Sequence, residues 1–486
     1  MSFLERPVSV GRSAALLAAS GCVEFGLQFL IPMILVRNLA ADDFGKYRIF
    51  MLTAGTALAL APAFMPQSLY YFLPRASTQG HGVVIGTVLA YLAGAGIVVA
   101  IVASPANPYV GAALREVFAA SRGMSALFLM LWIVVSISTV LPVAEGRVAW
   151  RVLSDVCIAA LRVAAIGLAA AYTHQLAWVV WALALEALVR LGVLAAYLAT
   201  GTGGARLAFD PGFLLTQFRY CLPFAVGAAL FVLRAQADQW IAATMLSHAA
   251  FAAFTIGAVV LPVASLIRQP INSAVLPHIS QAFAAGDAGR IVYLLSRSNQ
   301  VTALILLPAA GVLFAVAPEL VSLVFTPKYE AATPVMRIYL LGIMFQSIAT
   351  GYAFPSLNLG SLAMRINLGC LLFSIACSVV GVYYLGLAGA AIGSVLAFAL
   401  GEALNFRVMG KRLGSAATEM LPIPTIFRIG LGIALGNVAA FALGGHVSEN
   451  LFVLVMLKAI ACTVCTVGLY VATGGMADLR LLRSSF

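Results

Sequence analysis

Charged residues are scarce in this chain. Asp, Glu, Lys and Arg make up 9% of its 486 positions, whereas hydrophobic residues make up 63%, and the mean hydropathy is +1.04. Such a composition excludes an ordinary soluble protein. The apolar residues fall in many runs of about 18–25, the length that crosses a hydrocarbon core of about 30 Å as a helix. Because backbone polar groups must be paired inside lipid, the runs predict an all-α polytopic membrane protein.

Signatures of catalysis are also lacking. The five histidines do not cluster, and no G-x-x-x-x-G-K-[ST] loop is present, so ATP is not the direct fuel. The connections between the apolar runs are too short to hold a soluble domain. We therefore predict a non-enzyme, with a membrane polysaccharide polymerase or ligase as the competing enzyme class. The seven cysteines lie in apolar runs, and although Cys462-x-x-Cys465 has metal spacing, we expect no metal site.

The apolar runs predict about 14 spans, with edges good to a few residues. They are Ser13–Val36, Arg48–Tyr70, Val83–Ala103, Met124–Ala144, Val152–Ala171, Leu176–Leu198, Tyr220–Met245, Ala252–Ile271, Asn299–Val316, Met336–Ala353, Leu368–Tyr384, Leu387–Asn405, Ile426–Leu443 and Leu451–Thr473. Prolines inside the second and eighth of these, Pro62, Pro66 and Pro262, predict paired kinks.

Positive charge in the connections predicts the topology, because cytoplasmic segments carry the Lys and Arg excess. We place the N-terminus inside and let the spans alternate. The inside segments then hold Arg6, Arg12, Arg75, Arg147, Arg151, Arg206, Arg219, Arg290, Arg297, Arg365, Arg407, Lys411, Arg412, Arg480 and Arg483, and the outside segments hold Arg37, Lys46, Arg115, Arg122 and Lys328. Both ends are thus predicted to be cytoplasmic. The net charge of +11 is this topology signal and needs no nucleic acid. The first apolar run contains Glu24 and lacks a cleavage site, so we expect no cleavable signal.

The chain also repeats itself. Leu39–Tyr47 after the first span resembles Leu246–Phe254 after the seventh, and Leu73–Arg75 resembles Leu276–His278. An offset of six spans is even, so both copies have the same orientation in the membrane. This pattern is typical of transporters that hold their substrate between two halves and rock one half against the other.

Short strings then carry a family resemblance. They are Leu35-Val-Arg37-Asn-Leu39 through Phe44-Gly-Lys-Tyr47, Glu145-Gly-Arg147, and Leu323-Val-Phe325 with Lys328-Tyr329. With the helix plan, they resemble the polysaccharide-flippase (Wzx-like) branch of the multidrug/oligosaccharidyl-lipid/polysaccharide (MOP) exporter superfamily. The resemblance implies two parallel-repeat six-helix bundles, at 1–200 and 201–406, two additional C-terminal helices at 407–486, and a V-shaped central cavity.

The resemblance also implies a function. It is translocation of an undecaprenyl-diphosphate-linked oligosaccharide across the bacterial inner membrane for exopolysaccharide, capsule or O-antigen synthesis. Implied partners are the lipid-linked oligosaccharide, membrane lipids, and polysaccharide polymerase and chain-length or export proteins. A drug or cation exporter and a lipid II flippase of the same superfamily stay open as alternatives.

Charges and amides at membrane depth are the candidate site residues, because burying them in lipid is costly unless they face a cavity or a partner. Arg234, Gln236, Asp238 and Gln239 lie in the seventh span. Arg234 and Asp238 are four residues apart on one helix face. They form either a substrate-binding surface, where the planar guanidinium binds phosphate, or a structural ion pair. Arg162 in the fifth span is a further candidate for substrate binding, or pairs structurally between helices.

Carboxylates at membrane depth are the candidate ion-coupling sites. These are Glu24 in the first span, which either couples to an ion or pairs with an arginine, and Asp155 in the fifth span. We expect no cofactor and a proton or Na⁺ gradient as the energy source. Arg268, Glu186, Arg190 and Lys458 are expected to extend towards the membrane surface. The segment 277–300 is expected to form an amphipathic surface helix.

Overall fold

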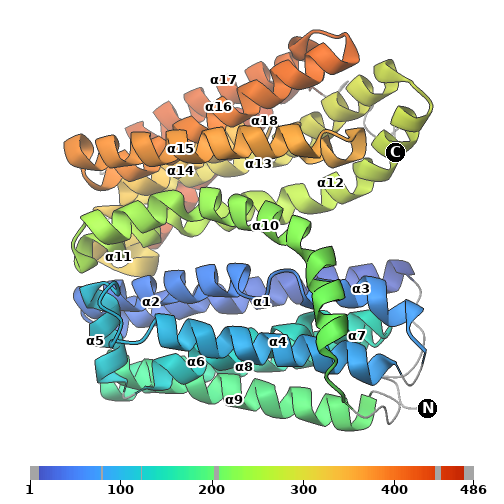
Figure 1. Cartoon of the computed structure of the whole chain (residues 1–486). Coiled ribbons are helices and arrows are strands. Elements are labelled where there is room, and N and C mark those ends of the chain that lie inside the picture. The colour runs from blue at the N-terminus through green and yellow to red at the C-terminus, as the bar shows by residue number, and fades with distance from the viewer. Residues whose placement is uncertain (1–9, 78–79, 122, 202–206, 444–449, 476–486) are drawn as a thin grey trace. The chain divides into compact units, whose positions relative to one another are not determined.

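The computed structural model describes residues 10–77, 80–121, 123–201, 207–443 and 450–475. Over these ranges the chain forms helices and no β-strand, which confirms the predicted all-α class (Figure 1). The α-helices are α1 (Val10–Asn38), α2 (Ala41–Leu60), α3 (Leu69–Phe72), α4 (His81–Val102), α5 (Ala112–Ala120), α6 (Met124–Val134), α7 (Leu141–Ala144), α8 (Val148–Thr173), α9 (Leu176–Gly201), α10 (Pro211–Met245), α11 (His248–Gly257), α12 (Leu261–Ala284), α13 (Ala288–Phe325), α14 (Ala332–Gln346), α15 (Gly360–Leu385), α16 (Leu387–Leu413), α17 (Ile423–Ala442) and α18 (Leu451–Ala472).

The chain folds as two compact units. Unit 1 comprises Met1–Leu233 and Ser247–Ala252, and unit 2 comprises Arg234–Leu246 and Ala253–Phe486. The long helix α10 therefore begins in unit 1 and ends in unit 2. The boundaries predicted at residues 200 and 406 divide the chain by its sequence repeat, whereas these two units divide it by compactness. The predicted boundaries therefore stay a prediction.

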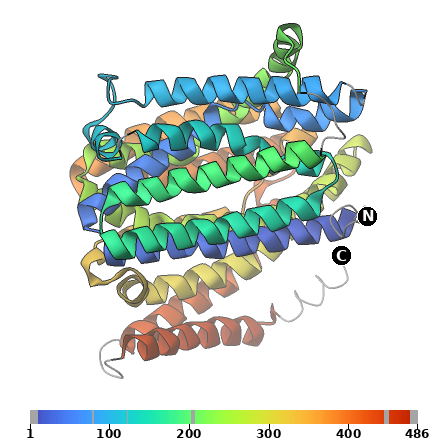
Figure 2. The same ribbon diagram turned by 90° about the horizontal axis from the view of Figure 1, so that it is seen from below.

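Long apolar helices pack side by side in unit 1. Helix α1 packs on α8, α8 on α9, α9 on α6 and α6 on α4, and Figure 2 shows these blue and green helices from below. Their apolar faces bury one another in a core that includes Leu73, Ile85, Val88 and Tyr197. The polar side chains between α8 and α9 therefore lie among buried apolar residues.

Helix α13 is central to unit 2, because α12, α14, α17 and α18 all pack on it. The approach of α17 is close: a Cβ built on Gly311 of α13 would lie 2.7 Å from the Ile433 side chain. The two last predicted spans, α17 and α18, thus pack directly on the helices of unit 2.

Twelve stretches of the described chain are long and apolar enough to cross a membrane, so the predicted number of 14 is not confirmed. Each predicted span has a helical counterpart, but the second and the tenth fall short. Helix α2 ends at Leu60 and is followed by a turn in which Ala63 and Phe64 have positive φ. Helix α14 has 15 residues and unwinds after Gln346.

The paired kinks are confirmed in the second and eighth spans. Helix α2 stops just before Pro62, and a 3-10 turn over Ala258–Val260 separates α11 from α12 just before Pro262. A proline nitrogen cannot donate the helical hydrogen bond, so each helix is interrupted where its ring enters.

The prediction of a surface helix over 277–300 is wrong. Helix α12 runs on to Ala284, and α13 begins at Ala288 behind Asp287, whose Oδ1 accepts a hydrogen bond from the Arg290 amide at 2.8 Å. The apolar positions of this segment, among them Ile279 and Leu295, are buried in a core with residues of α16. The apolar positions that predicted a helix on the membrane surface therefore pack against other helices of the protein.

Candidate functional site

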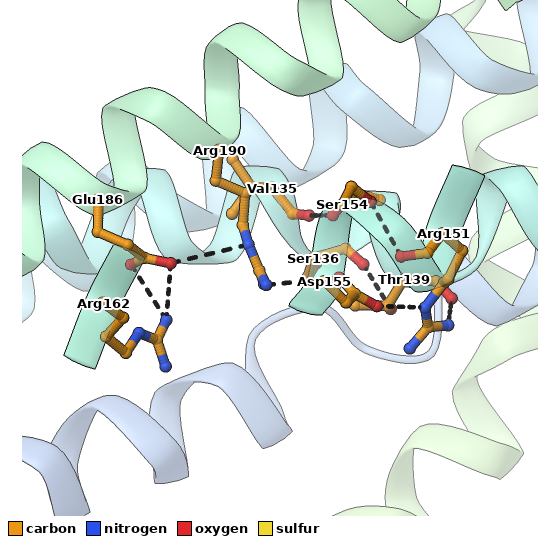
Figure 3. A network of polar contacts seen from close by, with 10 residues as sticks. Val135, Ser136, Thr139, Arg151, Ser154, Asp155, Arg162, Glu186 and Arg190 are labelled. Carbon is orange, nitrogen blue, oxygen red and sulfur yellow. Dashed lines mark hydrogen bonds and ion pairs between the residues drawn. The ribbon is translucent and has the colours of Figure 1, made fainter. Parts of the chain in front are cut away.

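Five charged side chains alternate in sign between α8 and α9 of unit 1 (Figure 3). In spatial order they are Arg151, Asp155, Arg190, Glu186 and Arg162, and we call them the ladder. Arg151 and Arg162 are 11 residues apart on α8, which corresponds to about 16 Å along the helix. The ladder thus follows half the thickness of a hydrocarbon core of about 30 Å.

Arg162 binds Glu186 with one nitrogen. Its Nη2 donates to Oε1 at 3.0 Å and to Oε2 at 3.1 Å, and the guanidinium carbon lies 5.2 Å from the centre of the Trp132 ring. The Glu186 side chain is 1% exposed and that of Arg162 is 12% exposed. Arg162 is therefore paired between two helices, as the structural interpretation expected.

Asp155 accepts from two other arginines. Arg151 Nε lies 2.6 Å from its Oδ2, and Arg190 Nη2 lies 3.5 Å from its Oδ1. Arg151 also donates to the backbone carbonyl of Thr139, at the end of a 3-10 segment that interrupts the fourth span after α6. The arginine thereby satisfies a carbonyl that lacks a helical partner.

Glu24 of α1 is half-buried and within electrostatic reach of the ladder. Its charge interacts with those of Asp155, Arg151, Arg190 and Arg162. Three guanidinium groups thus face three carboxylates when all are ionised. Protonation of any carboxylate leaves this region with net positive charge.

The ladder does not use all its donors. The Nε atoms of Arg162 and Arg190 are buried and have no hydrogen-bond partner in the described part of the chain. A buried donor without an acceptor is costly, typically about 1–3 kcal/mol.

Arg234 and Asp238 on α10 do not pair with each other. Arg234 Nη1 donates to Asn367 Oδ1 at 2.7 Å, and its guanidinium carbon lies 5.5 Å from the centre of the Phe398 ring. Asp238 is 1% exposed and accepts from the Tyr339 hydroxyl at 2.6 Å. No ion pair joins the two residues within the described ranges.

The two predicted glutamines flank Asp238. Gln239 donates its backbone amide to Asp238 Oδ1 at 2.8 Å, and both Gln239 and Gln236 are half-buried. The structure therefore brings Gln239 to Asp238 through its backbone. The role of both side chains in substrate binding stays a prediction.

A second polar centre surrounds the unwound end of α14, and the sequence analysis missed most of it. Arg268 of α12 donates to the carbonyls of Gln346 and Ala349, and Glu402 Oε2 of α16 accepts from the Thr350 amide at 3.2 Å. These contacts satisfy backbone groups that leave the helix at membrane depth. The signal that could have found this centre was Glu402 itself, a carboxylate in the twelfth predicted span.

The four residues expected to extend to the membrane surface have protein partners instead. Arg268 holds the α14 end, and Glu186 and Arg190 belong to the ladder. Lys458 Nζ lies 2.5 Å from Glu319 Oε1, with both side chains at most 10% exposed, so it pairs α18 with α13. A buried cation without an opposite charge would be strongly destabilising, and these contacts supply that charge or a backbone acceptor.

Twelve apolar helices of spanning length in the described ranges define a multi-pass membrane protein, and buried arginine–carboxylate contacts lie between its helices. No group of three or more His, Cys, Asp or Glu suited to a metal ion occurs in the described ranges. The chain belongs to the polysaccharide biosynthesis protein family, whose model matches residues 34–334.

Known proteins of similar sequence and structure agree with this family. A probable low-salt glycan biosynthesis flippase, Agl15 of Haloferax volcanii, is 24% identical over 148 residues, 30% of this chain and 31% of that protein, so the match spans less than a third of the relative. The structure of the lipid II flippase MurJ in an inward closed conformation matches with a TM-score of 0.71 and 11% identity, covering 94% of this chain and 99% of that one.

An inward-facing multidrug resistance transporter of the MATE family, from the MOP superfamily, matches with a TM-score of 0.64 and 15% identity, covering 80% of this chain and 94% of that one. At these identities the two structures show a shared fold. The family model confirms that the chain is a polysaccharide biosynthesis protein, and the shared fold agrees with the predicted resemblance.

Proposed function

We propose that this protein is a flippase for a lipid-linked oligosaccharide. The substrate is an undecaprenyl-diphosphate-linked repeat unit that moves from the cytoplasmic to the outer leaflet of the bacterial inner membrane, for exopolysaccharide, capsule or O-antigen synthesis. Membership of the polysaccharide biosynthesis family supports a role with glycans, and the relative named as a glycan biosynthesis flippase supports translocation. The fold shared with transporters supports alternating access and speaks against an enzyme.

The ladder is the observation that carries the proposal. A sugar diphosphate headgroup is polar and anionic, so it needs cations at membrane depth. Three arginines supply them, with side chains 12–25% exposed, and two of their Nε donors are buried without a hydrogen-bond partner in the described part of the chain. Because a guanidinium donates in pairs to phosphate as well as to carboxylate, Arg162 can exchange Glu186 for the diphosphate.

Arg234 is the proposed substrate contact of unit 2. The acceptor of its hydrogen bond is the amide oxygen of Asn367, which carries no charge and competes weakly with a phosphate. Gln236, Asp238 and Gln239 follow on the same helix and are proposed to accept or donate to sugar hydroxyls. The Asp238 carboxylate is held in place by Tyr339.

Glu24 and Asp155 are the proposed ion-coupling residues. Since Glu24 interacts with the ladder, binding a proton or Na⁺ removes negative charge beside three arginines and leaves them free for the diphosphate. No cofactor is required by this scheme, and an ion gradient supplies the energy. Polysaccharide polymerase and chain-length or export proteins are the proposed protein partners.

The ladder also bears on the two alternative functions, a drug or cation exporter and a lipid II flippase. An exporter of cationic drugs needs unpaired carboxylates in its cavity, whereas Asp155 and Glu186 of the ladder are matched by arginines. A lipid II flippase binds the same diphosphate chemistry, so the glycan that accumulates in a deficient cell separates it from the proposal.

The test is export of surface glycan from cells that lack the native protein. Arg234→Ala should abolish export at normal abundance. Arg234→Lys should restore part of it, because lysine returns the positive charge but not the planar guanidinium that donates two hydrogen bonds at once. Arg290→Ala is the matched control, since Arg290 is an exposed arginine of the same unit, and it should export normally. Normal export by Arg234→Ala would remove Arg234 from the site.

A further inference from the structure

The two segments related by the sequence repeat touch each other. Gly45 of α2 lies against the backbone of His248, the first residue of α11, and both residues belong to unit 1. A Cβ on Gly45 would lie 2.0 Å from the His248 carbonyl oxygen, closer than any side chain permits. The fully buried rings of Phe44 and Phe251, which occupy equivalent repeat positions, lie next to this contact in sequence.

A chain of charged side chains closes over this backbone contact. His248 Nδ1 lies 3.0 Å from Asp42 Oδ1, and Asp42 Oδ2 lies 2.9 Å from Lys46 Nζ. Lys46 Nζ also lies 2.5 Å from Glu116 Oε2 of α5. The charged groups around His248 are therefore Asp42 and Lys46 of α2 and, behind Lys46, Glu116 of α5.

Among the side-chain types in this group, imidazole is the one that can gain a proton near neutral pH. An ionised carboxylate only accepts hydrogen bonds, so Nδ1 of His248 donates to Asp42 whether the ring is neutral or protonated. Protonation adds a Coulomb attraction to the same contact. The hydrogen bond from Lys46 holds the pKa of Asp42 below its usual value of 3.8, so the carboxylate is still ionised when the histidine gains its proton.

We propose that His248 and Asp42 form a pH-sensitive latch, which holds the start of α11 against the start of α2 more tightly as the pH falls from about 8 to about 5.5. By the predicted topology both segments face the outside of the cell. The functional consequence rests on the proposed flippase: a tighter latch at acidic outside pH slows opening of the protein on that side.

Hydrogen exchange of the full-length protein in lipid nanodiscs tests the latch without any substrate. We expect the amides of residues 248–254 to gain roughly threefold to fivefold in protection between about pH 8 and about pH 5.5, after correction for intrinsic exchange. In His248→Gln, which keeps a hydrogen bond but cannot gain charge, protection should not change with pH. Peptides from α17 should show no pH effect in either protein.

Two further variants make the result decisive. Asp42→Asn removes the charge from the other partner and should also abolish the pH effect, which keeps the test valid if His248→Gln does not fold. Gly45→Ala forces the backbones apart and should lower protection at both pH values. A pH effect of equal size in His248→Gln or Asp42→Asn, or none in the wild type, overturns the latch. Because the measurement needs no transport, its failure leaves the flippase proposal standing, and failed glycan export leaves the latch standing.

Discussion

The ion pair between Arg162 and Glu186 can be assigned to structure or to transport by replacing both charges. The change is Arg162→Gln, Glu186→Gln and the double variant. Removing one partner of a buried ion pair costs about 3–5 kcal/mol, because the other charge is left in an apolar surrounding. In Arg162→Gln, Arg190 Nε still lies 3.9 Å from Glu186 and partly compensates its charge. We therefore expect the stability lost by this variant to lie near the lower end of that range.

The double variant should recover most of that stability. It leaves no uncompensated charge, and two amides can hydrogen-bond to each other, so we expect a net change of about 1 kcal/mol or less. Thermal unfolding is followed by the loss of the helical signal in far-ultraviolet circular dichroism. Glycan export is measured on the same variants at equal abundance. If Arg162 binds the diphosphate, the double variant is stable and does not export.

Lys458 and Glu319 provide the matched control. They form an equally buried ion pair in unit 2, between α18 and α13, to which we assign a structural role. Each single glutamine variant should lose stability, and the double variant should recover both stability and export. Recovery of export by the Arg162–Glu186 double variant as well would refute the reasoning, because both pairs would then be structural.

Three other predictions follow from the structure. A reporter that is active only outside the cell should be silent when fused after Arg412 and active when fused after Lys328, and the reverse pattern would invalidate the assumed topology. Arg268→Met leaves two backbone carbonyls at the end of α14 without a donor and should cost about 1–3 kcal/mol for each in thermal unfolding, with Arg268→Lys recovering part; an unchanged melting temperature would contradict this role. The hydrogen bond from Lys46 lowers the pKa of Asp42, so its stabilising effect is present at neutral pH and lost as pH falls below 3.8. Melting curves at decreasing pH should show this loss in the wild type but not in Asp42→Asn.

The helices were predictable because each corresponds to its own apolar run, which can be recognised from the sequence of that segment alone. Partners of charged residues were not, because they depend on which helices are neighbours. Asp155 and Arg162 share a face of α8 but do not pair with each other. Arg162 pairs with Glu186 of α9, and Asp155 pairs with Arg190 of α9 and with Arg151. Only the packing of α8 on α9 brings these side chains together.

Broken helices show the same limit. The run of apolar residues from 336 to 353 predicts an unbroken span, whereas the chain unwinds after Gln346. The interruption is stabilised by Arg268 and Glu402, which come from other helices. Lys458 was assigned to the membrane surface for the same reason, since its partner Glu319 lies 139 positions away in the chain.

Translocation by the purified protein tests the central claim most directly. The protein is reconstituted into vesicles that contain a polyprenyl-diphosphate-linked oligosaccharide, and a membrane-impermeant glycosidase reports which leaflet holds the sugar. The proposal predicts that an imposed ion gradient speeds transfer by the wild type, that Glu24→Gln loses the response to the gradient, and that the Arg162–Glu186 double glutamine variant transfers nothing. Transfer at the same rate by empty vesicles, or undiminished transfer by the double variant, would contradict it.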